Sequence, residues 1–390
     1  MNFLEYVTLN PKVSLEKGKI YPFIEMSDVG TCSRNPINIK YKRFDSGVKF
    51  EDGDTVIARI TPCLQNGKRF YCKDIGKGFG STEYLVFRPR NNSVDNLYLY
   101  YVLSTDFVKE SMVKSMVGAT GRQRVNNEVF SRLEMEFPDI DTQRRIASTL
   151  SAYDELIENN KKQIKLLEEA AQRLYKEWFI DLHFPGHEST QIIDGLPTGW
   201  SKKSLSSFGE IITGKTPPTE KSEYYGGSIP FVKIPDMHNC VYPINTEMTL
   251  TIAGASTQKN KFIPKNGIMV SCIATVGLVN IATTLCQTNQ QINSIILKEE
   301  KDLYYIYSTM KRLKLLLEGL GSNGATMTNV NKAKFEKLEV LCPISELREK
   351  YFDFCRPIFE KIYSLSVGIN KLTQARDRLL PKLMSGEIEV

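Results

Sequence analysis

The chain carries one segment twice, and this duplication constrains its fold more than any other feature. EVFSRLEMEFP, starting at Glu128, aligns with AKFEKLEVLCP, starting at Ala333, so the offset is 333 − 128 = 205 residues. A looser match joins YPFIEMSDV, from Tyr21, with IPFVKIPDM, from Ile229. The pattern predicts two copies of one unit, each a variable globular part, a strand that ends at a proline, and a helix.

An apolar stripe with a 3.5-residue period follows each copy, and nine of the ten positions in each stripe are apolar. The first stripe comprises Ile146, Leu150, Tyr153, Ile157, Asn160, Ile164, Leu167, Ala171, Leu174 and Trp178. The second comprises Tyr351, Cys355, Ile358, Ile362, Leu365, Ile369, Leu372, Arg376, Leu379 and Leu383. This period is typical of a coiled-coil seam. Alternatively, each stripe packs on its own domain.

The stripes predict two long helices, over about 142–179 and 345–384, which would bury each other's apolar faces. Asn160 falls on the first stripe and is expected to fix the register, as a buried asparagine does in coiled coils. Pro357 lies inside the second helix. Because proline lacks a backbone N–H donor, we expect the helix to kink or restart there.

Length and composition set broad limits. The 390 residues suffice for two or three domains, and the net charge of +6 permits nucleic-acid binding without requiring it. The eight cysteines include no CxxC pair, so we expect neither a metal cage nor a disulfide framework, and a reducing cytoplasm. The first residues resemble no targeting segment. The apolar stretch 267–282 is predicted to form two buried strands rather than a membrane span.

One segment matches the phosphate-binding P-loop pattern without its expected context. It reads GEIITGKT, from Gly209 to Thr216, and Pro217 and Pro218 follow directly. A phosphate-binding loop opens a helix whose N-terminus holds the anion, whereas two prolines disfavour a helix at this point. We therefore predict that the segment does not bind a nucleotide.

No other pattern predicts catalysis or a metal centre. His183 and His187 are four residues apart, but Pro185 and Gly186 between them exclude a shared helical face, so a connecting loop is favoured over a metal site. No paired carboxylates, Ser–His or Cys–His arrangement is convincing. The Asn/Asp-Pro-Pro-aromatic tetrapeptide of amino-methyltransferases is absent from the sequence. This pattern is typical of a protein that positions a substrate for a partner.

Two glycine-containing loops are the best candidates for contacting DNA. The first is GATGRQR, with Thr120, Arg122, Gln123 and Arg124, and its counterpart in the second half contains Asn323. Glycine lets a backbone approach closely, arginine can pair with guanine through two hydrogen bonds, and glutamine can pair with adenine. A surface turn that contacts nothing is the alternative.

Several longer segments resemble the specificity subunit of type I restriction–modification systems. IDTQRRIASTLSAYDELIENNKKQIKLLEEAAQRLYKEWFIDLHFPG resembles the central helical region of that family, and LPTGWSKKSLSSFGEIITGKTP resembles the entry into its second target-recognition domain. LTQARDRLLPKLMSGEIEV resembles its C-terminal end, and VTLNPKVSLEKGKIYPFIEMSDV resembles the start of one kind of first domain. Two departures are Arg348, where the repeat has Gln143, and an N-terminus without the Gly-Trp pair at 199–200.

The resemblance implies an α+β fold in which two antiparallel coiled-coil helices join and space two target-recognition domains with pseudo-twofold symmetry. The implied boundaries are 1–140 for the first domain, 141–184 for the central helix, 185–343 for the second domain and 344–390 for the C-terminal helix. Further implied DNA contacts come from Lys215 and from segments that precede corresponding strands. These segments contribute Glu83, Tyr84, Asn289 and Gln290.

The resemblance also implies the partners. The chain would bind double-stranded DNA and two methyltransferase subunits that carry S-adenosylmethionine, and restriction subunits that use ATP and Mg²⁺ would join for cleavage. The chain itself would hold no cofactor and would not bind a membrane. Two alternatives stay open: a specificity subunit of another restriction system, of the type IIB or IIG kind, and a coiled-coil scaffold that does not bind DNA.

Overall fold

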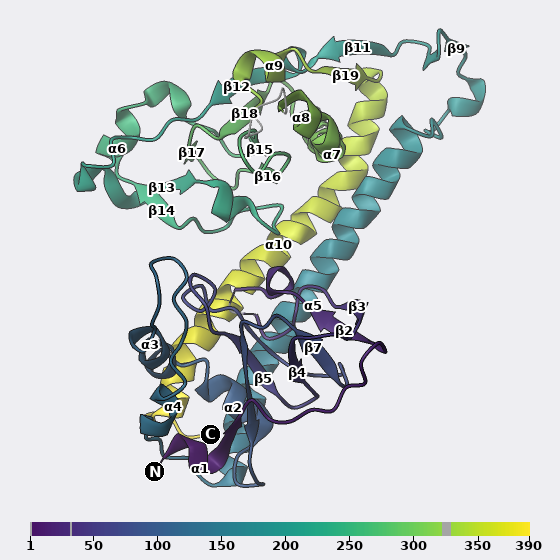
Figure 1. Ribbon diagram of the computed structural model, residues 1–390. Helices are drawn as coiled ribbons and strands as arrows, with labels where there is room; N and C mark the ends of the chain where they lie inside the picture. The colour runs from purple at the N-terminus through teal and green to yellow at the C-terminus, as the bar shows by residue number, and fades with distance from the viewer. Residues whose placement is uncertain (1, 32, 322–328) are drawn as a thin grey trace. The chain divides into compact units, whose positions relative to one another are not determined.

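A computed structural model of the protein describes residues 2–31, 33–321 and 329–390. The chain divides into two compact units. Unit 1 contains residues 1–157 and 372–390, so both termini belong to it (Figure 1). Unit 2 contains residues 158–371. Two 40-residue helices, α5 (Ile140–Phe179) and α10 (Ser345–Met384), each contribute one part to either unit.

Unit 1 is built on two four-stranded sheets. The antiparallel sheet has the order β1-β8-β5-β6, with β1 (Val7–Leu9), β8 (Tyr84–Pro89), β5 (Thr55–Ala58) and β6 (Arg69–Tyr71). The mixed sheet has the order β3-β2-β7-β4, with β3 (Lys40–Arg43), β2 (Ile20–Ile24), β7 (Gly78–Gly80) and β4 (Val48–Phe50). Helices α2 (Asn96–Val102) and α3 (Asp106–Lys114) follow β8.

Unit 2 contains an antiparallel sheet with a corresponding strand order. Its order is β12-β18-β15-β16, with β12 (Gly209–Thr213), β18 (Ile292–Leu297), β15 (Ile268–Ser271) and β16 (Val279–Ile281). A second sheet has the order β14-β13-β17, with β14 (Met248–Leu250), β13 (Tyr225–Val232) and β17 (Gln287–Thr288). Strands β15 and β16 lie in the stretch 267–282 and are buried, which confirms the expected pair of strands.

Corresponding parallel strand pairs occur in the two units. In unit 1, Phe23 of β2 pairs with Phe79 of β7, and in unit 2, Phe231 of β13 pairs with Gln287 of β17. The offsets are 231 − 23 = 208 and 287 − 79 = 208. The duplication is therefore visible in strand pairing as well as in sequence.

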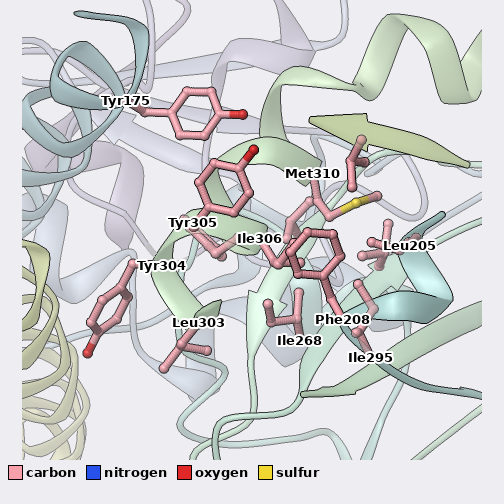
Figure 2. Packing of buried hydrophobic residues seen from close by; sticks show 14 of the residues in the cluster. Tyr175, Leu205, Phe208, Ile268, Ile295, Leu303, Tyr304, Tyr305, Ile306 and Met310 are labelled. Atoms are coloured by element: carbon pink, nitrogen blue, oxygen red, sulfur yellow. The ribbon is translucent and has the colours of Figure 1, made fainter. Parts of the chain in front are cut away.

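Helix α7 (Leu303–Arg312) is central to the core of unit 2, because it is buried on more than one side. Figure 2 shows Ile306 and Met310 near Ile268 and Ile295 of the sheet. Other faces of α7 meet the long helices: Tyr304 stacks on Phe359 with ring centroids 4.3 Å apart. Such aromatic packing contributes dispersion and area burial that polar surface helices lack.

Each long helix begins with a buried polar side chain that reaches back into its unit. In unit 1, Gln143 donates to the carbonyl oxygens of Ser93 and Pro138 at 2.8 Å and accepts from the amide of Asp95 at 2.9 Å. Asp95 is the N-cap of α2, where its carboxylate accepts two backbone hydrogen bonds. Gln143 is fully buried, and both its amide nitrogen and its amide oxygen are hydrogen-bonded inside the unit.

Unit 2 uses an arginine at the corresponding position, 348 − 143 = 205 residues later. Arg348 donates to the carbonyl oxygen of Pro343 at 3.2 Å and forms a buried ion pair with Asp302. Asp302 is the N-cap of α7. The sequence departure at Arg348 thus changes the chemistry of the junction and keeps its connections.

The two long helices contact each other inside each unit. In unit 2, Trp178 lies 5.9 Å from Tyr351 between ring centroids, and a methyl group at Gly368 would lie 3.5 Å from Nδ2 of Asn160. From the first contact to the second, the residue number falls by 178 − 160 = 18 in α5 and rises by 368 − 351 = 17 in α10, so the two segments run antiparallel. Ile157, Ile362 and Leu365 are buried. The other predicted seam residues, Asn160, Ile164, Leu167, Leu174, Ile369, Leu372 and Leu379, are half-buried.

Two sequence expectations differ from the structure. Helix α10 runs through Pro357 as one 40-residue element, so the restart expected there is wrong. Buried Cys355, Phe359 and Ile362 hold the surrounding turns in the core of unit 2, which offsets the missing donor. The Pro-terminated strand exists only in the second copy, as β19 (Glu339–Cys342), which pairs with β11 (Ser201–Ser204).

In the first copy that strand is replaced by a single bridge between Asn2 and Glu134. The reason is local: the chain opposite Glu134 turns into the short helix α1 (Phe3–Tyr6), whose N-cap is Asn2. A helix at this point leaves no partner for a longer ladder.

The charged position on the second stripe has a buried partner in unit 1. Arg376 forms an ion pair with Asp154, and the hydroxyl of Tyr101 donates to the same carboxylate at 2.6 Å. Both charged side chains are over nine-tenths buried. Removing one partner of such a pair leaves an uncompensated buried charge.

We expect Arg376→Ala to lower the free energy of unfolding of unit 1 by about 3 kcal/mol. The matched control is Arg132→Ala, because the Arg132 side chain is 81% exposed and lies 3.8 Å from Glu128. That substitution should cost no more than about 1 kcal/mol. Urea unfolding followed by circular dichroism measures both. Equal unfolding midpoints for the two variants would refute a stabilising role of the buried pair.

Candidate nucleic-acid interface

A closed hairpin loop displays the first group of candidate residues in unit 1. Val117 and Arg124 exchange two backbone hydrogen bonds of 2.9 Å, which enclose residues 118–123. Gly118 and Gly121 have φ values of 122° and 80°, in the left-handed region that favours glycine. Thr120 and Arg122 are exposed on this loop.

The base of the loop is fastened to the segment that follows β5. The amide of Gln123 donates to the hydroxyl of Thr61, and the amide of Thr61 donates to the carbonyl oxygen of Gln123, both at 3.0 Å. The amide of Val125 donates to the carbonyl oxygen of Arg59 at 2.9 Å. Exposed side chains are thus carried on a backbone that is fixed at both ends.

Glu83 and Arg124 meet beside this loop. The Nε of Arg124 lies 2.9 and 3.0 Å from the two carboxylate oxygens of Glu83, and Nη2 lies 2.7 Å from one of them. The hydrogen bonds from Arg124 lower the pKa of Glu83, so the carboxylate is ionised at neutral pH. Sequence analysis named both residues but could not pair them, since they are 41 positions apart.

Tyr84 is a correction to the predicted DNA contacts. Its side chain is 2% exposed and its ring centroid lies 5.8 Å from that of Phe70 in the core. Tyr84 is the first residue of β8, whose first four residues are all buried, and it packs in the same core cluster as Phe70 and Val86. Burial also raises the pKa of the Tyr84 hydroxyl. We expect no base contact from this side chain.

In unit 2, the segment Gly214-Lys215-Thr216 follows β12 and lies against β17. The amide of Lys215 donates to the carbonyl oxygen of Thr288 at 2.9 Å, and Nε2 of Gln258 donates to the carbonyl oxygen of Lys215 at 2.7 Å. The hydroxyl of Thr216 donates to the side-chain oxygen of exposed Gln290 at 2.8 Å. The Lys215 side chain is exposed on this fixed backbone.

The P-loop pattern has no matching geometry. Residues Gly209–Thr213 form a strand, and residues 214–221 after it are not helical. The next element is a short 3-10 turn at Ser222–Tyr224. Lys215 therefore does not stand at a helix N-terminus.

A buried amide cluster under Lys215 was missed by sequence analysis. Nε2 of Gln258 also donates to Oε1 of Gln287 at 2.8 Å, and Nε2 of Gln287 donates to the carbonyl oxygen of Ala255 at 3.0 Å. Both glutamines are over nine-tenths buried. Gln258 sits in a polar stretch with no periodic signal, so nothing in the sequence distinguishes it from a surface residue.

Asn289, a predicted DNA contact, is buried, and its side chain stabilises a turn. It is 8% exposed, and its side-chain oxygen accepts from the amide of Gln291 at 3.2 Å. Unit 1 has the same kind of turn, in which the hydroxyl of Ser81 accepts from the amide of Glu83 at 3.2 Å. Asn323 lies outside the described residues.

The histidine pair lies at the end of α5. Nδ1 of His183 lies 3.6 Å from a carboxylate oxygen of Glu177, and Nδ1 of His187 lies 2.9 Å from the carbonyl oxygen of Phe184. Across residues 2–31, 33–321 and 329–390, no cluster of three or more metal-ligating side chains is found. None of the helices in those ranges has the length and hydropathy of a membrane span.

Comparison with known proteins identifies the family. The model of the "Type I restriction modification DNA specificity domain" matches the chain twice, over residues 7–169 and 197–373. The specificity subunit of the type I restriction enzyme HindI from Haemophilus influenzae is 30% identical over 94% of this chain and 95% of its own. This chain belongs to the family of type I restriction–modification specificity subunits.

Further members of the type I family show the same likeness. The MjaIX specificity subunit from Methanocaldococcus jannaschii is 28% identical over 77% of this chain and 71% of its own length. The crystal structure of the type I S subunit from M. genitalium shares the fold, with a TM-score of 0.56 at 16% identity. That comparison covers 98% of this chain and 95% of the other.

We expect Gly214→Ala to disturb the Lys215 segment. A Cβ atom at Gly214 would lie 2.2 Å from the carbonyl oxygen of Asn289 and 2.3 Å from that of Thr288. The backbone must shift, which should lower the free energy of unfolding by roughly 1–3 kcal/mol. Faster hydrogen exchange at the Lys215 amide would locate the effect.

Gly319→Ala is the matched control, because an added Cβ there would have no described atom outside its own helix backbone within 4 Å, and the residue is in helix α8 (Lys314–Gly321). Helix propensity predicts an unchanged or slightly higher stability for this variant, by at most about 1 kcal/mol. If both variants unfold at the same urea concentration, the close approach at Gly214 has no structural role.

Proposed function

We propose that the chain is the sequence-specific DNA-reading subunit of a type I restriction–modification complex and performs no chemistry itself. The observation that carries the proposal is the double match to the specificity-domain model, which covers both units. The related subunit HindI, similar over nearly the whole of both chains, supports the same role. Each unit would read one half of a bipartite target.

The DNA-facing elements are the anchored loops of the two units. In unit 1 these are the loop with Thr120, Arg122 and Gln123 and the adjoining Arg124, and in unit 2 the segment with Lys215 and the neighbouring Gln290. Exposed polar side chains on a fixed backbone suit base reading because little ordering is needed on binding. Glycine positions allow the backbone to approach DNA closely.

The long helices would space the two half-sites. Each has 40 residues, and at about 1.5 Å per residue it is roughly 60 Å long. One turn of DNA measures roughly 34–36 Å. Antiparallel pairing of α5 and α10 along a coiled-coil seam, with the duplicated units related by a pseudo-twofold axis, would leave unread base pairs between the half-sites.

The complex would supply the chemistry through its other subunits. Two methyltransferase subunits would bring S-adenosylmethionine to adenines in the half-sites, and restriction subunits would use ATP and Mg²⁺. The chain would hold no cofactor and would work in the cytoplasm. The scaffold alternative would need no duplicated polar loops, and a chromosomal neighbour encoding a methyltransferase would distinguish a type I complex from other restriction systems.

The purified chain alone should neither methylate DNA nor hydrolyse ATP. We expect no methylation because the sequence lacks the Asn/Asp-Pro-Pro-aromatic tetrapeptide of amino-methyltransferases. We expect no ATP hydrolysis because Lys215 follows a strand and precedes a non-helical segment, whereas nucleotide phosphates are held at a helix N-terminus. A coupled ATPase assay and a methyl-transfer assay test this, and addition of the methyltransferase subunit should restore methylation. ATP turnover that disappears in Lys215→Ala would contradict the proposal.

The spacing role predicts a change in target gap. Inserting one heptad after Leu167 and one after Leu372 keeps both apolar stripes in phase and adds roughly 10 Å to each helix. The unread gap should then lengthen by about three base pairs, at 3.4 Å each, while both half-sites keep their bases. Genome-wide mapping of methylated adenines measures the gap.

A heptad after Leu167 alone is the control, because it breaks the match between the two stripes and should abolish or weaken methylation. An active complex that carries both insertions and methylates sites with the original gap would show that these helices do not set the spacing.

A further inference from the structure

The ion pair between Glu83 and Arg124 is partly exposed, yet hydrogen bonds restrain the backbone of both residues. The two residues come from separate segments, one at the entry to β8 and one at the base of the 118–123 loop. Glu83 accepts at its backbone carbonyl from the amide of Arg59 at 2.9 Å, and Arg124 exchanges two backbone bonds with Val117. Both partners are therefore fixed at the backbone before their side chains meet.

An ion pair within a single helix of the same unit lacks these restraints. Lys114 and Glu110 lie one turn apart on α3, with side chains 78% and 64% exposed. By contrast, the Arg124 and Glu83 side chains are 48% and 24% exposed and join through three contacts of 2.7 to 3.0 Å. A flexible pair contributes little to stability, whereas a fork-shaped pair fixes the plane of the guanidinium.

The hydrogen-bond geometry leaves a defined donor set on Arg124. Glu83 engages Nε and Nη2. Guanidinium carries five N–H groups, so both hydrogens of Nη1 and one of Nη2 are available to another acceptor. Guanine presents two acceptors, N7 and O6, in the major groove, and arginine is the side chain that most often pairs with them.

We infer that Glu83 is a positioning residue that holds Arg124 to read a guanine in the half-site of unit 1. The inference rests on the proposed DNA-reading function and assigns one base within it. A carboxylate at this place also repels DNA phosphates, so it weakens binding to unrelated DNA. Glu83 should therefore increase discrimination at the expense of non-specific affinity.

The test uses the complete complex with its methyltransferase subunits and the variants Glu83→Gln and Arg124→Lys. Dissociation constants are measured for an unmethylated duplex with the sequence that the complex methylates. They are also measured for duplexes in which each guanine of either half-site is replaced in turn. Both variants should lose discrimination at one and the same base pair of one half-site, by roughly 5- to 150-fold. The other half-site should be read as before.

Two readouts separate positioning from a merely structural role. Glu83→Gln should bind unrelated DNA as tightly as the unaltered complex or more tightly, whereas a folding defect would weaken all binding. The double variant should discriminate no worse than Arg124→Lys alone, because both changes remove one interaction. Lys114→Gln on α3 is the control and should leave discrimination unchanged.

Unchanged discrimination in both variants would overturn the inference. So would an even loss of affinity for all duplexes with a smaller salt dependence, since that is the behaviour of a phosphate contact. If the unaltered complex itself shows no preference for any sequence, the proposed function fails and the base assignment fails with it.

Discussion

One buried side chain at the start of each long helix joins that helix to its globular unit. Gln143 and Arg348 both donate a hydrogen bond to the carbonyl oxygen of the proline five residues earlier. Each also contacts an N-cap residue of its unit, Asp95 of α2 for Gln143 and Asp302 of α7 for Arg348. A buried polar group is costly unless its bonds are satisfied. These bonds therefore hold the first turns of each long helix against the unit in which that helix begins.

The two units have sheets with a corresponding strand order but present different side chains on their surfaces. A serine or asparagine turn precedes β8 and β18 alike, formed by Ser81 in unit 1 and Asn289 in unit 2. Two residues later the side chains differ. Glu83 forms an ion pair with Arg124, whereas the amide oxygen of Gln291 accepts a hydrogen bond from the side chain of Asn289. A different side chain after a turn that both units share changes the chemistry presented there without changing the sheet. Under the proposed function, this would let the two units read different half-sites.

The irregular positions of the two apolar stripes are structural features in their own right. Arg376 is buried against Asp154 in unit 1, and Asn160 approaches Gly368 in unit 2. A buried ion pair tolerates few alternative alignments, because a shift of one helix along the other would leave both charges unpaired. Arg376 therefore restricts which residues of α5 and α10 can face each other within unit 1, whereas the register role of Asn160 stays a prediction.

Sequence alone determined the features that depend on local periodicity: the duplication, the two 40-residue helices to within about two residues, and the strands β15 and β16. Only the tertiary structure decided the partners of single side chains. It turned Tyr84 into the core, placed Gln258 beneath Lys215 and joined Glu83 to Arg124. The physical reason is that a stripe repeats within one helix and is readable along the chain, whereas a hydrogen bond or an ion pair depends on distant segments that only folding brings together.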